Sequence, residues 1–284
     1  MTKPLVRHLN AGNLWSLPEG SSVPRLETCD INYAAIKAEG VIAIQHHFPD
    51  EAVFNAGLLM TGMGRVLAPD QARAIAETQK GWSFLSSTWH VGTGLETDAE
   101  MDALAGAVLD AQAATGLPIT IETHRATMTQ DIRRTLSLIE RFPELRFTAD
   151  LSHWYTGHEM TYGDIAAKFD AMEPVFERVR YIHGRIGTPC CVQVAIDAND
   201  DRAFVGNFRE MWQRCIAGFK RTAAAGEMLP FAPELLPYSI SIGGQEHLLY
   251  YAQQVGNIDT ETEQSDRWEQ AQILWEIAKD CEAL

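Results

Sequence analysis

Four acidic or imidazole side chains stand at the ends of apolar, strand-like stretches in the second half of the sequence. They are Glu122 in LPITIETH, Asp150 in LRFTAD, His183 in VRYIHGRIG and Glu234 in MLPFAPEL. Three carboxylates and one imidazole gathered in one cleft would repel one another and titrate abnormally unless positive charge lay between them. A divalent cation is the natural occupant of such a group.

The ligand types narrow the choice of metal. Sites rich in oxygen, with one nitrogen and no sulfur, suit Mn²⁺ or Mg²⁺ best and can also accept Co²⁺ or Zn²⁺. We therefore predict one divalent metal ion, held by Glu122, Asp150, His183 and Glu234. A lone carboxylate at a strand end is more often a helix cap, so the prediction depends on all four residues together.

Three histidines outside this group are candidate substrate contacts. His153 follows Asp150 by three residues and can point into the same cleft as a hydrogen-bond partner. His47 and His90 follow or end earlier strand-like runs and could donate to substrate hydroxyl groups, although a structural role is equally compatible with their positions.

Aromatic and amide side chains near the same strand ends complete the predicted site. Trp154 could pack against the C–H face of a sugar, as could Trp15 and Trp89, but a tryptophan beside a strand more often belongs to the core. Gln193 lies in the long irregular segment after His183 and could supply an amide group to the substrate.

The elements that must position these residues alternate along the chain between β-prone and helical patterns, as in parallel βα units. A capping box of Thr97 and Glu100 predicts the start of one helix and Gly116 its end. Thr127 and Gln130 are predicted to cap the next helix in the same way. The expected strands are at residues 5–9, 41–45, 57–64, 82–90, 117–124, 145–150, 179–187 and 228–235.

Further helices are predicted over residues 162–179, around residues 208–219 and near the end of the chain, where Trp268 and Trp275 recur at helical spacing. No linker-like or repeated segment interrupts the pattern. The simplest architecture is a single α/β domain over residues 1–284, folded as one (β/α)₈ TIM barrel. In that fold, the carboxyl ends of the strands converge on one face.

Composition excludes some functions. The chain has 23 Lys and Arg against 38 Asp and Glu, a formal charge of −15, which disfavours nucleic-acid or anionic membrane partners. Its five cysteines are scattered without a pairing pattern, and no apolar run has the length of a signal peptide or membrane span. A reduced, cytoplasmic protein is the expectation.

The stretches TIETH, ADLSHW, YIHGRIG and FAPEL together resemble the xylose isomerase-like TIM barrel superfamily, which includes sugar phosphate isomerases and epimerases. The resemblance covers about residues 117–240. It implies that the four strand-end residues hold the metal and that His153 and Arg185 contact substrate. A second Glu that follows the first ligand in ketose epimerases is absent here. His124 or Arg125 would take over part of its role, with surface pairing an equal alternative for Arg125.

The predicted activity is that of a metal-dependent isomerase or epimerase on a sugar, keto-sugar or related polyhydroxy ketone. A proton is removed beside the carbonyl, the metal stabilises the enediolate, and Glu122 and Glu234 remove and return the proton. The main alternative is a lyase or dehydratase acting on a keto-sugar, keto-glycoside or inosose. A non-catalytic sugar-binding subunit is a further alternative. We expect the small-molecule partner to be an unphosphorylated carbohydrate. The sequence does not decide whether the protein forms a homo-oligomer.

Overall fold

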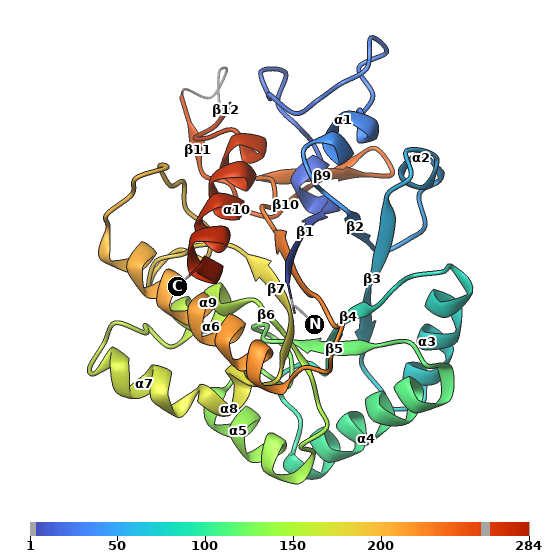
Figure 1. The fold of residues 1–284 in the computed structure, drawn as a ribbon, viewed down its shortest axis with the longest axis vertical. Helices are drawn as coiled ribbons and strands as arrows, with labels where there is room; N and C mark the ends of the chain where they lie inside the picture. The colour runs from blue at the N-terminus through green and yellow to red at the C-terminus, as the bar shows by residue number, and fades with distance from the viewer. Residues whose placement is uncertain (1–3, 257–261, 284) are drawn as a thin grey trace.

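The computed structural model describes residues 4–256 and 262–283. Eight parallel strands close into a barrel in chain order, with β8 pairing back to β1 (Figure 1). The predicted TIM barrel fold is thereby confirmed, while a single domain over residues 1–284 stays a prediction. The barrel strands are β1 (Leu5–Asn10), β2 (Ala43–His46), β3 (Leu59–Val66), β4 (Ser87–Val91), β5 (Ile119–Glu122), β6 (Phe147–Ala149), β7 (Val179–Gly184) and β8 (Leu229–Pro233).

Helices connect the strands and surround the barrel (Figure 1). The crossover between β2 and β3 contains only a five-residue helix. The helical elements are η1 (Ala11–Leu14), α1 (Tyr33–Ala38), α2 (Glu51–Asn55), α3 (Gln71–Gly81), α4 (Asp98–Thr115), α5 (Ile132–Arg141), α6 (Leu151–Gly157), α7 (Ile165–Ala171), α8 (Glu173–Phe176), α9 (Ala203–Thr222) and α10 (Arg267–Ala283).

The signals at the ends of α4 act as predicted, but those expected for α5 do not. The capping box of Thr97 and Glu100 is present, and Gly116 ends α4 in the left-handed conformation at φ 65°. The predicted Thr127–Gln130 box is wrong. Asp131 caps α5 by accepting from the Arg134 backbone N–H at 2.7 Å, because its carboxylate lies directly before the first helical turn.

Two other helix predictions need correction. The single helix expected over residues 162–179 is two short helices, α7 and α8, that meet at Met172. Pro174 has no backbone N–H to donate and cannot continue a helix from α7. The short helix α6 directly after β6 was not predicted. Asp150 is its N-cap, accepting from the Ser152 backbone N–H at 3.2 Å.

The inside of the barrel is polar, although the interior of such barrels is usually filled by branched apolar side chains. Buried hydroxyl groups form a chain across it: Thr88 lies 2.8 Å from Thr148, and Thr148 lies 2.6 Å from Thr120. The apolar side chains of the strands instead pack outward against the helices, as Trp89, Phe147 and Ile182 do. Buried polar groups are stable only when they are hydrogen-bonded. These hydrogen bonds therefore hold the side chains inside the barrel in fixed positions.

The segment between β8 and α10 adds two small hairpins that no sequence signal predicted. They consist of β9 (Ser239–Ile242) with β10 (Gln245–Leu248), and β11 (Gln254–Val255) with β12 (Thr262–Glu263). Both follow the carboxyl end of β8 and lie at the same end of the barrel as η1 and α1 (Figure 1). They therefore flank the mouth toward which the predicted site residues project.

Two features bear on the predicted cellular setting. All five cysteines are free thiols. Among residues 4–256 and 262–283, no helix combines the length and apolar character needed to cross a bilayer.

Candidate metal centre

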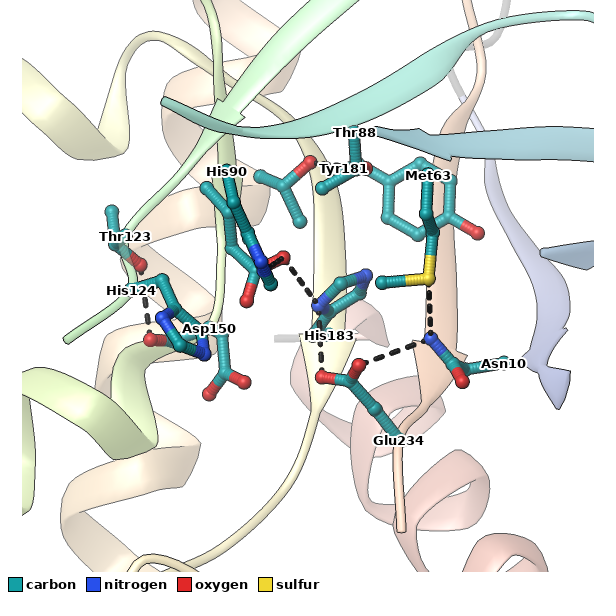
Figure 2. A network of polar contacts seen from close by, with 12 residues as sticks. Asn10, Met63, Thr88, His90, Thr123, His124, Asp150, Tyr181, His183 and Glu234 are labelled. Atoms are coloured by element: carbon teal, nitrogen blue, oxygen red, sulfur yellow. Dashed lines mark hydrogen bonds and ion pairs between the residues drawn. The ribbon is translucent and has the colours of Figure 1, made fainter. Parts of the chain in front are cut away.

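The structure brings the four predicted metal ligands together at the carboxyl ends of β5 to β8. One ligand atom from each of Glu122, Asp150, His183 and Glu234 lies within 4.8 Å of the others, and all four residues are buried. Figure 2 labels Asp150, His183 and Glu234 of this group. Glu122 ends β5 and His183 lies near the end of β7, whereas Asp150 and Glu234 directly follow β6 and β8. Adjacent parallel strands end at the same barrel edge, which is why these residues, distant in sequence, converge.

The hydrogen bonds of His183 leave one ring nitrogen for the carboxylates. Its Nε2 donates to Gln45 Oε1 at 2.8 Å, and the Gln45 amide is oriented because its Nε2 donates to Thr88. The opposite nitrogen, Nδ1, lies 3.0 Å from Glu234 Oε2 and 3.5 Å from Glu122 Oε2 (Figure 2). A lone pair aimed at two carboxylates needs a positive charge between them, either a proton or a metal ion.

The pKa values of the groups at the centre reflect this crowding. Burial opposes a charge on His183, but Glu234 and Glu122 outweigh burial and raise its pKa well above the usual value. Burial raises the pKa of Asp150 to about 7, with Arg185 acting against it and the other two carboxylates adding to it. A divalent cation would relieve both effects, because it neutralises the carboxylates without burying a proton.

The buried donor atoms also fit a metal. His183 Nδ1 and Glu234 Oε2 have no conventional hydrogen-bond partner among the described residues, although both are buried. Buried polar atoms without partners are rare in folded proteins and call for an explanation such as a bound ion. Three carboxylates and one imidazole form a donor set that suits Mn²⁺ or Mg²⁺.

Arg185 is the cation that the structure itself supplies to the centre. Its Nη2 pairs with Asp150 Oδ2 and lies 3.5 Å from Glu234, while its Nε donates to the Ser152 hydroxyl at 3.0 Å. The same Nη2 lies 3.0 Å from His153 Nε2. A guanidinium can only donate, so His153 Nε2 must be the acceptor and carry no proton.

The predicted substrate contacts His90 and His124 lie beside Glu122. His90 Nε2 is 3.0 Å from Glu122 Oε2, and its Nδ1 is 2.9 Å from an Arg65 nitrogen, so Arg65 makes Nε2 the nitrogen that donates to Glu122. The His124 ring lies between those of His90 and His153, at centroid distances of 4.2 and 3.9 Å, and is tilted relative to both. The structure thus makes His90 a partner of Glu122 rather than a free donor, which differs from its predicted role.

Two other predicted contacts are corrected by the structure. Trp154 is buried in the core, and its indole N–H donates to the Thr129 carbonyl at 2.7 Å, because the unpredicted helix α6 turns it away from the mouth. The Gln193 amide both donates to and accepts from the backbone of Leu236, at 3.0 Å each. Gln193 therefore fastens the loop after β7 to the loop after β8.

The remaining aromatic candidates divide between core and rim. Trp89 is fully buried and donates to Gln79, so it is not at the mouth. His47 is exposed at the rim and stacks on Trp15 at a centroid distance of 6.3 Å. Although part of the side chain is exposed, desolvation of its ring lowers the pKa of His47, as do the nearby His46 and His90.

Sequence reasoning missed two residues that complete the centre. Asn10 Nδ2 donates to Glu234 Oε1 at 3.1 Å (Figure 2). The same nitrogen donates to Gln45 Oε1 at 2.9 Å. Gln45 also accepts from His183. Asn10 and Gln45 each stand near the carboxyl end of an apolar strand in the first half of the chain. That position is the sequence signal from which they could have been predicted. Tyr251, which stacks under Arg185 at 5.0 Å and under Arg125 at 5.5 Å, had no such signal.

No protein-family model matches the chain, and no curated protein is similar enough in sequence to count as a relative. Solved structures do match its fold. A xylose isomerase-like TIM barrel protein from Mycobacterium smegmatis in complex with magnesium is 9% identical, with a TM-score of 0.54 over 99% of this chain and 97% of that one. A D-tagatose 3-epimerase-like protein is 10% identical, with a TM-score of 0.53 over 98% of each chain.

A xylose isomerase domain protein from Planctomyces limnophilus is 14% identical, with a TM-score of 0.51 over 82% of this chain and 90% of that one. At such low identities, the similarity concerns the fold. The chain therefore has the fold of xylose isomerase-like TIM barrel proteins, as its four sequence motifs indicated.

Proposed function

We propose that the protein is a divalent-metal-dependent isomerase or epimerase that acts on a sugar, keto-sugar or related polyhydroxy ketone. The observation that carries the proposal is the buried meeting of Glu122, Asp150, His183 and Glu234, whose ligand atoms lie within 4.8 Å of one another. The names of the fold neighbours, which include an epimerase-like protein and a magnesium complex, are compatible with this chemistry.

The same four residues would hold the metal, with Mn²⁺ or Mg²⁺ as the best match to their donor atoms. When bound, the ion would supply Lewis acidity that stabilises negative charge on a carbonyl oxygen and its neighbouring hydroxyl oxygen.

Glu122 and Glu234 are the proposed acid and base. Each lies close to His183 Nδ1, and each has one oxygen positioned by a hydrogen-bond donor: Asn10 for Glu234 and His90 for Glu122. One carboxylate would remove the proton beside the carbonyl and the other would return it to the opposite face or to the adjacent carbon. Return to the same carbon gives an epimer, and return to its neighbour gives an isomer.

The lyase alternative needs an acid that protonates a leaving group, and His153 was its candidate. Because His153 Nε2 accepts from Arg185 at 3.0 Å, it has no proton to deliver from that nitrogen. The proton of the neutral His153 ring is therefore on Nδ1, and elimination stays the alternative to isomerisation or epimerisation.

Proton NMR of candidate ketoses in D₂O, with Mn²⁺-loaded or Mg²⁺-loaded protein and with the metal removed before recording, tests the proposal. We expect deuterium to enter the carbon beside the carbonyl, and Glu234→Gln to abolish this exchange because it removes a proposed acid–base group. Glu140→Gln, on an exposed residue of α5, is the matched control and should exchange like the wild type. Unchanged exchange in Glu234→Gln would remove the catalytic role assigned to that residue.

A further inference from the structure

A cavity lies at the amino-terminal ends of the barrel strands, at the opposite end from the candidate metal centre. Its volume is about 660 Å³, and most of its lining residues lie in the first halves of the strands or in the loops before them. Pockets that bind small molecules typically measure roughly 300–1,000 Å³. The cavity therefore has the size of a ligand site and takes no part in the chemistry proposed above.

The walls of the cavity are mainly apolar. Val6, Ile42 and Ile119 line it, together with Leu59 and Met228, which are 47% and 50% exposed. Large apolar side chains that stay exposed around a hollow commonly mark a binding surface. A ligand that fits here presents an apolar body to these walls.

The deep end of the cavity is polar and includes an imidazole nitrogen without a partner. His8 is only 4% exposed and lines the cavity, and its Nδ1 lies 3.2 Å from the Tyr181 hydroxyl. The only hydrogen bond that the described residues make with the His8 ring is the one at Nδ1, so Nε2 is open to a ligand. Burial lowers the pKa of His8 to about 3, so the imidazole is neutral and offers one donor or one acceptor to a ligand.

The cavity also carries an arginine without a carboxylate partner. Arg146 lines it, and its described hydrogen bonds use only Nη1, which donates to the carbonyls of Pro143 and Leu145. Burial and then the charge of Arg178 lower the pKa of Arg146, while Glu227 and Glu144 act in the opposite direction. No described ion pair joins either glutamate to Arg146; Glu227 pairs instead with Arg180, at 3.3 Å.

We propose that this cavity binds a small carboxylate with an apolar body, such as a hydroxyaryl carboxylate. The carboxylate would accept from the unused Nε and Nη2 of Arg146, because charge-assisted guanidinium–carboxylate contacts are the strongest available here. The ring would pack on the apolar wall, and a hydroxyl group at its far end would reach His8. Such a site is separate from the metal centre and from the activity proposed for it.

Isothermal titration and saturation-transfer NMR with 4-hydroxybenzoate test the proposal. The full-length protein is used after removal of metal by a chelator, so that the carboxylate cannot bind a metal ion at the other end of the barrel. We expect saturable 1:1 binding and about tenfold or more weaker binding of the neutral analogue 4-hydroxybenzyl alcohol. Benzoate, which lacks the hydroxyl group, should bind less tightly than 4-hydroxybenzoate.

Variants then locate the bound probe. Arg146→Gln should weaken 4-hydroxybenzoate binding about tenfold or more and remove the preference over the alcohol. Arg133→Gln removes an equal charge from an exposed position on α5 and should leave binding unchanged. Leu59→Glu places a negative charge on an exposed side chain at the rim, so it should also weaken binding without disturbing the core.

Three results would overturn the proposal: no saturable binding of 4-hydroxybenzoate, equal affinity in the wild type and in both Arg146→Gln and Leu59→Glu, or loss of binding in Asp150→Asn instead. A concentration-dependent dimer in light scattering that Leu59→Glu dissociates would overturn it too, because the apolar rim would then be covered by a second copy of the chain.

Discussion

At the residue scale, Asp150 and His183 of the candidate metal centre each make two different contacts at once. Asp150 caps α6 with Oδ1 and pairs with Arg185 through Oδ2. The common role of a strand-end aspartate as a helix cap and its predicted role at the centre are therefore compatible in one residue. His183 is similar, because Gln45 holds one nitrogen and thereby directs the other toward Glu122 and Glu234.

A pH prediction belongs to the residue scale. His8 has a pKa of about 3 in the folded chain, because burial disfavours its charged form, against an ordinary value of 6.5. Between these values the unfolded chain binds the extra proton, so His8 costs stability progressively as the pH falls below about 6.5. We expect urea unfolding of His8→Gln to show a smaller loss of unfolding free energy between pH 6.5 and 4 than the wild type. An equal loss of unfolding free energy in the two proteins over this pH range would mean that His8 is not buried as a neutral imidazole.

At the scale of elements, the site is assembled by strand ends and then bordered by loops. Residues from β1, β2, β4, β5 and β7 converge because parallel strands share one edge, whereas Tyr251 comes from the segment between β8 and α10. Its ring contacts both Arg125 and Arg185, at 5.5 and 5.0 Å. Through Tyr251, this segment therefore contacts both the rim, at Arg125, and the buried centre, at Arg185.

Replacing Tyr251 tests that role. Tyr251→Ala removes the aromatic face under both guanidinium groups, each contact being worth roughly 0.5–2 kcal/mol. Because Tyr251 does not contact the proposed acid–base groups, we expect the KM for a ketose substrate to rise severalfold while kcat stays within about twofold. Steady-state kinetics of Tyr251→Ala should separate the effect on KM from the effect on kcat. Tyr251→Phe, which keeps the ring, is the matched comparison. A kcat loss with unchanged KM would contradict a positioning role for this segment.

At the scale of the whole molecule, the two ends of one barrel carry different sets of side chains, and we propose a different role for each. Three carboxylates crowd the carboxyl end, while the amino-terminal end holds a cavity lined by apolar side chains and His8, with Arg146, Arg180, Glu144 and Glu227 among its charged lining residues. Tyr181 lies between them, in contact with His8 and with its ring edge-on to His183 at 5.6 Å. The polar barrel interior is thus continuous from the cavity to the proposed metal ligands.

Metal binding should be visible as global stability. An ion that binds the folded chain alone, at about 100 times its dissociation constant, raises the unfolding free energy by about 2.7 kcal/mol. We expect Mn²⁺ or Mg²⁺ to shift the thermal midpoint of chelator-treated protein upward, and Asp150→Asn to lose most of that shift. Glu140→Gln, at an exposed position, should keep it. An identical shift in Asp150→Asn would place the ion elsewhere.

The sequence by itself determined the barrel and the order of the strand-end residues. Alternating β-prone and helical runs, with Glu122, Asp150, His183 and Glu234 at consecutive strand ends, were readable because both patterns are local. The capping box of Thr97 and Glu100 was readable for the same reason.

Only the tertiary structure decided what those residues contact. The partners Asn10 and Gln45 come from strands more than 130 residues away from His183, and no local pattern encodes a distance between such positions. Trp154 was assigned to the mouth because α6 was not predicted, and its burial followed from the direction of that helix. Pairwise contacts across a closed barrel depend on its closure, a property of the whole chain.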